Sequence, residues 1–147
     1  ELTMFNSVLI VCTGNICRSP IAERFLRRKI PDKKFDSAGT NALRHQPADP
    51  SAIAVAEKHG LLLDNHMSTQ FTPMLGRQYD LILVMEKYHQ QQISRMSPEL
   101  RGKTMLLGYW LEQRDIPDPY RKSQEAFESV YQLIDLACRS WVQKLNG

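Results

Sequence analysis

Two short apolar runs rich in branched residues constrain the fold of this chain most. Ser7–Val11 (SVLIV) and Asp80–Met85 (DLILVM) have the pattern of buried strands. A helix is predicted after each run, one from Ser19, which can cap it with Pro20 in the first turn, and one over Glu86–Met96. Strands that alternate with helices predict a parallel sheet covered by helices on both faces.

Weaker patterns supply the other elements. Phe35–Gly39 and Met105–Leu107 are predicted to be strands, and an extension of the second to Trp110 is left open. Aspartate or threonine followed by proline is typical of a helix start, and Gly60 suits the end of the first such helix. These two helix starts are Asp49-Pro50 and Thr72-Pro73.

The strongest helical pattern covers Ser123–Asn146. Its apolar residues recur at helical spacing along one face, which predicts a core-facing helix. Cys138 lies on that face, and we interpret it as a small buried hydrophobe.

Length and composition indicate a single globular domain. The 147 residues, 42% of them hydrophobic, can close over one core, and we predict one domain over residues 4–147. Met4 is expected to be the native first residue, with residues 1–3 as an added remnant. A net charge of +3 is too small to predict nucleic-acid binding. The apolar runs fall short of the about 18 residues that span a bilayer, so no membrane protein is predicted.

Three cysteines exclude a complete disulfide framework. The first residues do not have the pattern of a secretory signal, so we expect a cytoplasmic protein with reduced thiols. Cysteine and histidine do not pair at the spacing of zinc ligands, so no metal and no cofactor are predicted. The four histidines, each expected on the surface or satisfied in the core, are His45, His59, His66 and His89.

The segment after the first predicted strand carries the candidate chemistry. A loop that leads into a helix N-terminus turns backbone N–H groups inward, and the helix dipole adds positive charge. Gly14 permits the unusual backbone angles that such an anion-binding nest needs. Arg18 closes the loop with a guanidinium fork that fits two phosphate oxygens. Cys12, beneath the nest and near the Ser19 hydroxyl, is therefore predicted to be an activated nucleophile.

A nucleophile that attacks a phosphate ester would also need an acid to protonate the leaving group. Asp118 lies between Pro117 and Pro119, which stiffen its backbone and bias it away from helix. Protonation of a departing phenolate typically contributes about 10² to 10⁴ in rate. Asp118 is therefore the predicted general acid.

Val11–Pro20 (VCTGNICRSP) resembles the active-site loop of the low-molecular-weight protein tyrosine phosphatases. Asp36–Gly39, Tyr79–Met85 and Asp118–Tyr120 also fall where that family has counterparts, so the resemblance covers the whole chain. Ile116–Ser123 (IPDPYRKS) is most similar to the bacterial Wzb-type enzymes of capsule and exopolysaccharide export. The family's fold is a three-layer α/β sandwich with a four-stranded parallel sheet in the order 2-1-3-4.

The resemblance implies a role for each site residue. Cys12 attacks phosphorus and forms a cysteinyl phosphate, Arg18 binds equatorial oxygens, and Asp118 protonates the tyrosine and then activates water. Asn15 matches the residue that braces the loop, with Ser37 and His66 as partners. The residues that match the family's phosphate-binding loop are Thr13, Gly14, Asn15, Ile16, Cys17, Arg18 and Ser19. Ser19 matches the residue that stabilises the thiolate, and Cys17 the second cysteine, which forms a reversible disulfide with Cys12.

Two departures from the animal members concern the substrate cleft. Leu43 replaces a large aromatic wall residue, and Arg121 replaces a second tyrosine after Asp-Pro-Tyr. Tyr120 stays as a wall for the substrate ring.

The resemblance also implies a partner, and two other functions stay open. The partner is a phosphotyrosine protein, expected to be the cytoplasmic tail of a membrane tyrosine autokinase. An arsenate reductase shares the fold and loop, but it would need further cysteines between Cys17 and Cys138 to pass a disulfide outward. A phosphotyrosine-binding module without turnover would not need Cys12, Arg18 and Asp118 together.

Overall fold

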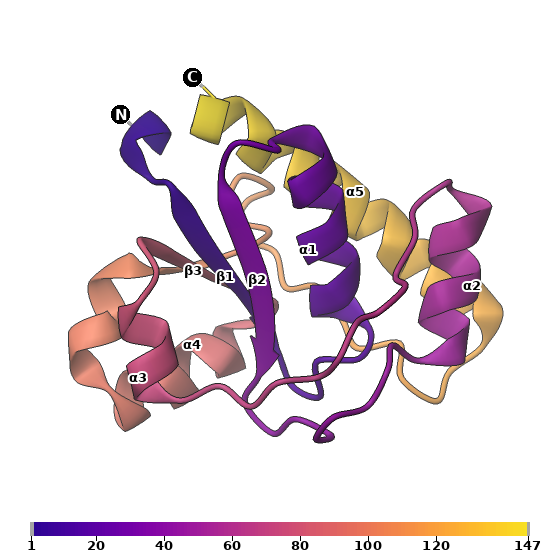
Figure 1. Cartoon of the computed structure of the whole chain (residues 1–147), viewed down its shortest axis with the longest axis horizontal. Helices are drawn as coiled ribbons and strands as arrows, with labels where there is room; N and C mark the ends of the chain where they lie inside the picture. Colours follow the sequence, from indigo (N-terminus) through magenta and orange to yellow (C-terminus); the bar gives the residue numbers. More distant parts are fainter. Residues whose placement is uncertain (1, 147) are drawn as a thin grey trace.

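A four-stranded parallel sheet in the order β2-β1-β3-β4 forms the centre of the computed structural model, which describes residues 2–146 (Figure 1). The strands are β1 Ser7–Cys12, β2 Lys34–Gly39, β3 Leu81–Val84 and β4 Thr104–Leu106. All three pairings are parallel, which confirms the expected class and strand order. The expectation that residues 1–3 are an added remnant falls partly on Glu1, which lies outside the described residues.

Helices cover both faces of this sheet. In Figure 1, α1, α2 and α5 lie on one side, and α3 and α4 lie on the other. Their bounds are α1 Arg18–Lys29, α2 Pro50–Lys58, α3 Pro73–Arg77, α4 Lys87–Met96 and α5 Gln124–Asn146, with short 3₁₀ helices η1 Leu2–Met4 and η2 Pro98–Lys103. Over residues 2–146, no helix is both long enough and apolar enough to cross a membrane.

Alternating side chains of β1 enter two separate cores. Val8 and Ile10 pack in the core that α1, α2 and α5 cover, whereas Leu9 and Val11 pack in the core under α4. All four are fully buried, as expected of a central parallel strand. Two-sided burial explains why the SVLIV run is apolar throughout.

The helix starts predicted from the sequence are confirmed at α2 and α3. The Asp49 carboxylate accepts a hydrogen bond from the Ser51 N–H at 2.9 Å, and the Thr72 hydroxyl accepts one from the Leu75 N–H at 3.1 Å. Gly60, with φ of 77°, takes the left-handed conformation shortly after α2.

The start of α1 differs from the prediction. The helix begins at Arg18, so Ser19 lies inside the first turn and does not cap it. The Ser19 hydroxyl instead contacts Cys12 and the Asn15 amide. Serine is common at helix caps, but this preference predicted the wrong role for Ser19, because its hydroxyl is already hydrogen-bonded to the Cys12 thiol and the Asn15 side-chain amide.

The fourth strand also ends earlier than its longest predicted form. β4 stops at Leu106, where the Tyr109 N–H donates to the Leu106 carbonyl at 3.0 Å and turns the chain. Gly108 then forms an antiparallel bridge with Arg114, whose carbonyl oxygen would lie 2.1 Å from a Cβ at position 108. The extension to Trp110 is therefore wrong.

Candidate active site

The loop between β1 and α1 has its carbonyl groups turned outward. The carbonyls of Cys12, Thr13, Gly14 and Ile16 accept hydrogen bonds from Thr40, Asn41, Leu43 and Asp49, respectively, at 2.9 to 3.2 Å. In a trans peptide the C=O and the next N–H point in opposite directions. The N–H groups of the Cys12–Ser19 loop that follow these carbonyls are therefore turned toward the inside of the loop.

The Cys12 thiol lies inside the Cys12–Ser19 loop. Its Sγ atom accepts a hydrogen bond from the Asn15 N–H at 3.3 Å and lies 2.9 Å from the Ser19 hydroxyl oxygen. Its residue is only 2% exposed. A backbone donor and a side-chain hydroxyl of the loop therefore both reach the Cys12 sulfur.

Asn15 braces the loop from within. Its side-chain N–H group donates to Ser19 and Ser37 at 2.8 and 3.0 Å, and its side-chain oxygen accepts from the Thr69 N–H at 2.8 Å. The His66 Nε2 atom lies 2.6 Å from the Asn15 carbonyl oxygen. The contacts that the resemblance implies for Asn15 with Ser37 and His66 are therefore present.

The left-handed residue of the loop is Asn15, with φ of 60°, and not Gly14. Asparagine tolerates this conformation better than most residues, and here its side chain is held by three hydrogen-bond partners, the Ser19 and Ser37 hydroxyls and the Thr69 N–H. A Cβ at Gly14 would meet only Ile16 and Leu43 at ordinary contact distances of 3.7 and 4.0 Å. The prediction that Gly14 supplies the special backbone angles is thus wrong.

Gly39 is required by close approach, which sequence reasoning missed. A Cβ at position 39 would lie 2.3 Å from the Thr13 carbonyl oxygen and 3.1 Å from Asn15. β2 therefore supports the start of the loop through a residue without a side chain.

Arg18 is buried and held by two groups from other elements. Its Nη1 atom donates to the Glu86 carboxylate at 2.5 Å and to the Ile116 carbonyl at 2.7 Å. Glu86 caps α4 at the carboxyl edge of β3, the edge where parallel sheets bind ligands. That rule, applied to the predicted strand Asp80–Met85, could have identified Glu86.

Asp118 reaches the site from the segment between β4 and α5. Ile116 anchors this segment, since it is fully buried and its N–H donates to the Met85 carbonyl at 2.8 Å. The Asp118 carboxylate accepts from the Tyr120 N–H at 3.0 Å and lies 3.7 Å from Arg18 Nη2. About half of its side chain is exposed, so it stands at the mouth of the site.

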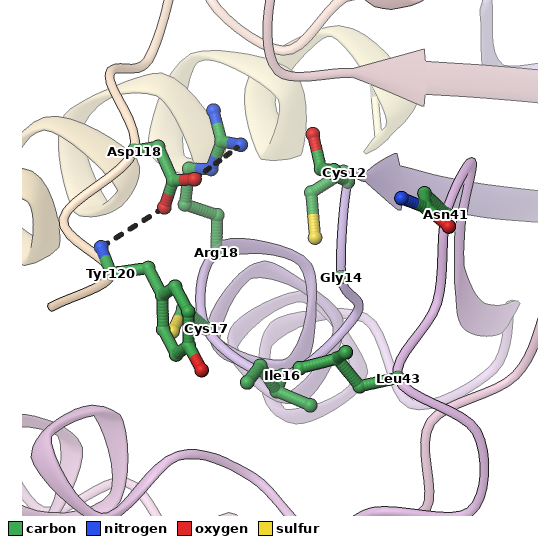
Figure 2. Close-up of a pocket in the computed structure, with 10 residues that line it drawn as sticks. Cys12, Gly14, Ile16, Cys17, Arg18, Asn41, Leu43, Asp118 and Tyr120 are labelled. Carbon is green, nitrogen blue, oxygen red and sulfur yellow. Dashed lines mark hydrogen bonds and ion pairs between the residues drawn. The ribbon is translucent and has the colours of Figure 1, made fainter.

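A cavity of about 170 Å³ opens above the thiol (Figure 2). Leu43 and Tyr120 form part of its wall, and both are partly exposed. Its lining consists of Cys12, Thr13, Gly14, Ile16, Cys17, Arg18, Asn41, Leu43, Asp118 and Tyr120. The structure therefore brings Cys12, Arg18 and Asp118 to one cavity. Arg121 lies outside the lining, with its guanidinium 5.5 Å from the centre of the Tyr120 ring.

Ser37 and His66 lie behind the loop, away from the cavity. The Ser37 hydroxyl donates to the buried Glu23 carboxylate at 2.5 Å, which also pairs with Arg27 at 3.1 Å. Burial lowers the pKa of His66, which favours its neutral form. Glu23, which the sequence analysis did not select, thus ends a chain of hydrogen bonds that reaches the loop through Ser37.

The other two thiols have a different environment from Cys12. Burial raises the pKa of Cys17 and of Cys138, so both stay protonated at neutral pH. Cys138 lies fully buried on α5, which confirms its interpretation as a small hydrophobe. Within the part of the chain that the structure describes, no group of three or more His, Cys, Asp or Glu side chains could hold a metal ion.

The fold and this site define an α/β protein with a buried thiol at the base of a cavity, beneath inward-turned amides and beside a buried guanidinium. Comparison with known proteins specifies the family. The family model for low molecular weight phosphotyrosine protein phosphatases matches residues 7–147.

A putative low molecular weight protein-tyrosine-phosphatase of Klebsiella pneumoniae is 60% identical over 98% of this chain and all of its own length. Wzb of Escherichia coli K12, a protein of the same class, is 53% identical over 98% of both chains. The crystal structure of the tyrosine phosphatase Wzb from E. coli K30 with sulphate superposes with a TM-score of 0.95, at 62% identity and over 97% of this chain and 99% of that one. The chain belongs to the low molecular weight protein tyrosine phosphatase family and is of the Wzb type, as the sequence predicts.

Proposed function

We propose that this protein hydrolyses phosphotyrosine in proteins through a cysteinyl-phosphate intermediate, without metal or cofactor. The observation that carries the proposal is the position of the Cys12 sulfur, which is buried beneath inward-turned amides and shares one cavity with Arg18 and Asp118. A tetrahedral dianion in that cavity would meet the loop N–H groups and the guanidinium together.

In the first step, the Cys12 thiolate attacks phosphorus and the P–O bond to the tyrosine breaks. Asp118 in its acid form transfers a proton to the departing phenolate oxygen. The phenolate is basic, because the phenol that it becomes has a pKa near 10. Arg18 and the loop N–H groups bind the equatorial oxygens, where charge gathers in the transition state. The products are the dephosphorylated tyrosine side chain of the substrate protein and a phosphoryl group bonded to the Cys12 sulfur.

In the second step, a water molecule releases the phosphate. The Asp118 carboxylate takes a proton from the water, the water oxygen attacks phosphorus, and the S–P bond breaks. Inorganic phosphate leaves, and the Cys12 thiolate and the Asp118 acid are restored. Asp118 can serve both steps because it stands at the mouth of the cavity, where the leaving group departs and the water enters.

The cavity walls favour an aromatic substrate. Ile16, Leu43 and Tyr120 line the cavity above the loop and offer apolar surface to a phenyl ring. A phosphoserine has no ring to contact these walls. We infer that the walls select phosphotyrosine, with Leu43 and Tyr120 as ring contacts and Arg121 acting through the Tyr120 ring.

The physiological substrate is inferred from the relatives. Because the chain is of the Wzb type, we infer that it acts in the cytoplasm on the phosphorylated tyrosine-rich tail of a membrane autokinase that controls capsule or exopolysaccharide production. Release of phosphate from such a tail by the wild-type protein, and none by a Cys12→Ala variant, is the expected result. A tail that stays phosphorylated while a phosphotyrosine peptide is hydrolysed would overturn this partner.

Cys17 supports a second proposal, reversible protection of the nucleophile. Peroxide would oxidise the Cys12 thiolate to a sulfenic acid. The Cys17 sulfur would then attack the Cys12 sulfur, the S–O bond would break, and the hydroxyl group would leave as water with the Cys17 proton, which gives a disulfide that a dithiol reduces. Peptide mass spectrometry should find this linkage after oxidation, and a Cys17→Ala variant should lose recoverable activity. Full recovery in that variant would exclude the disulfide.

A turnover assay on matched phosphopeptides in the presence of a metal chelator tests the main proposal. Phosphotyrosine should be hydrolysed and phosphoserine spared, and Cys12→Ser should bind the phosphotyrosine peptide without turning it over. Equal hydrolysis by Cys12→Ser would remove Cys12 from the mechanism, and binding without turnover by the wild type would indicate a binding module. Arsenate-dependent oxidation of a thioredoxin-type partner would instead indicate an arsenate reductase.

A further inference from the structure

His89 is a fully buried histidine that lies in the first turn of α4 and contacts the Cys12–Ser19 loop. Its Nδ1 atom accepts a hydrogen bond from the Glu86 N–H at 3.1 Å, and its Nε2 atom lies 2.8 Å from the Thr13 hydroxyl oxygen. A backbone N–H can only donate, so Nδ1 must be the unprotonated nitrogen. In a neutral ring the hydrogen is then on Nε2, which donates it to Thr13.

The surroundings of His89 keep the ring neutral. Burial, together with the Arg18 guanidinium, lowers its pKa to about 4, although Asp118 and Asp115 act in the opposite direction. The ring therefore presents one acceptor and one donor throughout the neutral pH range. Its two hydrogen bonds fix its tautomer.

Thr13 is held from two sides. On the side of α4 its hydroxyl accepts from His89, and on the side of β2 its carbonyl accepts from the Asn41 N–H at 2.9 Å. Thr13 follows Cys12 directly and lines the cavity. The peptide groups on either side of Thr13 carry the Thr13 and Gly14 N–H groups, which are turned inward, so the side chain and carbonyl contacts together set their direction.

The same turn of α4 also holds the other end of the loop. Glu86, the cap of this helix, binds Arg18 at 2.5 Å, and its side chain forms a capping box with His89. Two residues at the start of α4 thus hold the two ends of the loop: Glu86 contacts the phosphate-binding arginine, and His89 contacts the first residue after the nucleophile. An element far away in sequence sets the spacing between them.

We propose that His89 is a positioning residue, which holds Thr13 through its Nε2–H so that the first N–H groups of the loop point at the equatorial oxygens of the transferring phosphoryl group. This inference rests on the proposed function, since it concerns the same reaction. The loss of His89 should therefore weaken binding of a five-coordinate transition-state analogue more than binding of phosphate, because only the transition state places three oxygens in the equatorial plane.

Two substitutions separate the two hydrogen bonds of the ring. His89→Gln keeps a donor at about the position of Nε2, whereas His89→Asn keeps an acceptor for the Glu86 N–H but is too short to reach Thr13. With an aryl phosphate as substrate, His89→Asn should lower kcat roughly three- to tenfold, as loss of one hydrogen bond predicts. Vanadate, which adopts five-coordinate geometry, should bind more weakly by the same factor, and phosphate by roughly twofold or less. His89→Gln should stay near the wild type in all three quantities.

Thr13 variants test the contact from its other side. Thr13→Val should resemble His89→Asn, Thr13→Ser should resemble the wild type, and the Thr13→Val/His89→Asn double variant should lose no more than either single variant. The Thr13 variants leave His89 in place, and His89→Asn keeps an acceptor for the Glu86 N–H, so the start of α4 should stay folded. Thermal unfolding of each variant shows whether a change in the vanadate-to-phosphate affinity ratio occurs without a loss of stability.

An unchanged vanadate-to-phosphate ratio in His89→Asn would overturn the proposal, as would equal losses in His89→Gln and His89→Asn or fully additive losses in the double variant. Failure of the proposed function looks different. In that case the wild type would not hydrolyse phosphotyrosine peptides, while the anion-binding ratio of the variants would still report on the Thr13 contact.

Discussion

The Cys12 sulfur and the Ser19 hydroxyl oxygen lie 2.9 Å apart inside the loop that separates β1 from α1. The Ser19 oxygen already accepts a hydrogen bond from the Asn15 side chain at 2.8 Å, so its own hydrogen can be directed at the sulfur. The Asn15 N–H donates to the same sulfur. One asparagine therefore acts on the nucleophile twice, directly through its backbone and indirectly through Ser19.

Removal of the Ser19 hydroxyl should weaken the nucleophile. We expect Ser19→Ala to lower kcat for an aryl phosphate about 10- to 100-fold, the size of a lost hydrogen bond to a charged group. At one fixed pH, iodoacetamide should alkylate Cys12 more slowly in this variant than in the wild type. Ser140→Ala is the matched control, since that hydroxyl bonds only the Leu136 carbonyl on α5. Alkylation of Cys12 at the same rate in Ser19→Ala and the wild type would contradict the role of this hydrogen bond.

Loss of the acid should depend on the leaving group. Asp118→Asn is expected to slow hydrolysis of phenyl phosphate by about 10² to 10³, and to slow nitrophenyl phosphate less, because its phenolate needs less help from a proton. Asp115→Asn serves as the control in the same segment, where Asp115 accepts from the Lys87 N–H at 3.0 Å. A plot of rate against leaving-group basicity gives the result directly. An equal loss across the series would argue against the acid role.

Buried neutral histidines should make stability depend on pH. The pKa of His89 is about 4 in the folded protein, below the 6.5 of an exposed histidine, so the unfolded chain binds more protons between these values. The contribution of His89 to the free energy of unfolding is therefore fully present above pH 6.5 and is lost as the pH falls toward 4. Urea unfolding should show that wild type loses about 2 kcal/mol more than His89→Gln between pH 7 and pH 5. His66, whose pKa is also lowered, adds a loss of the same sign to both proteins. Equal pH dependence in the two proteins would show that His89 is not buried in its neutral form.

A methyl group at Gly39 should displace the loop. Its Cβ would lie 2.3 Å from the Thr13 carbonyl oxygen, which belongs to the backbone and cannot rotate away. Gly39→Ala should destabilise the fold by about 1–3 kcal/mol and weaken phosphate binding. Gly102→Ala, where a Cβ would meet nothing within 4 Å, should change stability by no more than about 0.5 kcal/mol. Denaturant melts of both variants make the comparison, and a stable Gly39→Ala with normal phosphate affinity would refute it.

Local sequence patterns were sufficient for most of the fold. Fully apolar runs identified β1 and β3 because both faces of these strands are buried, and side-chain caps identified the starts of α2 and α3. The end of β4 was not predictable, because Gly108 turns the chain through a bridge to Arg114, which is a contact between non-neighbouring residues.

The candidate site was predicted where its residues are neighbours in sequence. Cys12, Arg18 and Ser19 belong to one loop, and the two prolines beside Asp118 selected that residue on another segment, where the resemblance also has an acid. Glu86, His89 and Gly39 were not selected, because their importance arises from contacts across the sheet edge that only the fold creates. Asn15 has the unusual backbone conformation that was expected of Gly14, in addition to its bracing role, because an asparagine with several hydrogen-bond partners can adopt the left-handed conformation usually given to glycine.

Covalent catalysis by Cys12 can be tested by rapid quenching of the protein during turnover of a phosphotyrosine peptide, followed by peptide mass spectrometry. We expect a transient phosphoryl group on the Cys12 sulfur. This species should build up further in Asp118→Asn when nitrophenyl phosphate is the substrate, because release of the phosphate then lacks its base. Turnover without any phosphorylated Cys12, or with the phosphoryl group on another residue, would contradict covalent catalysis by Cys12.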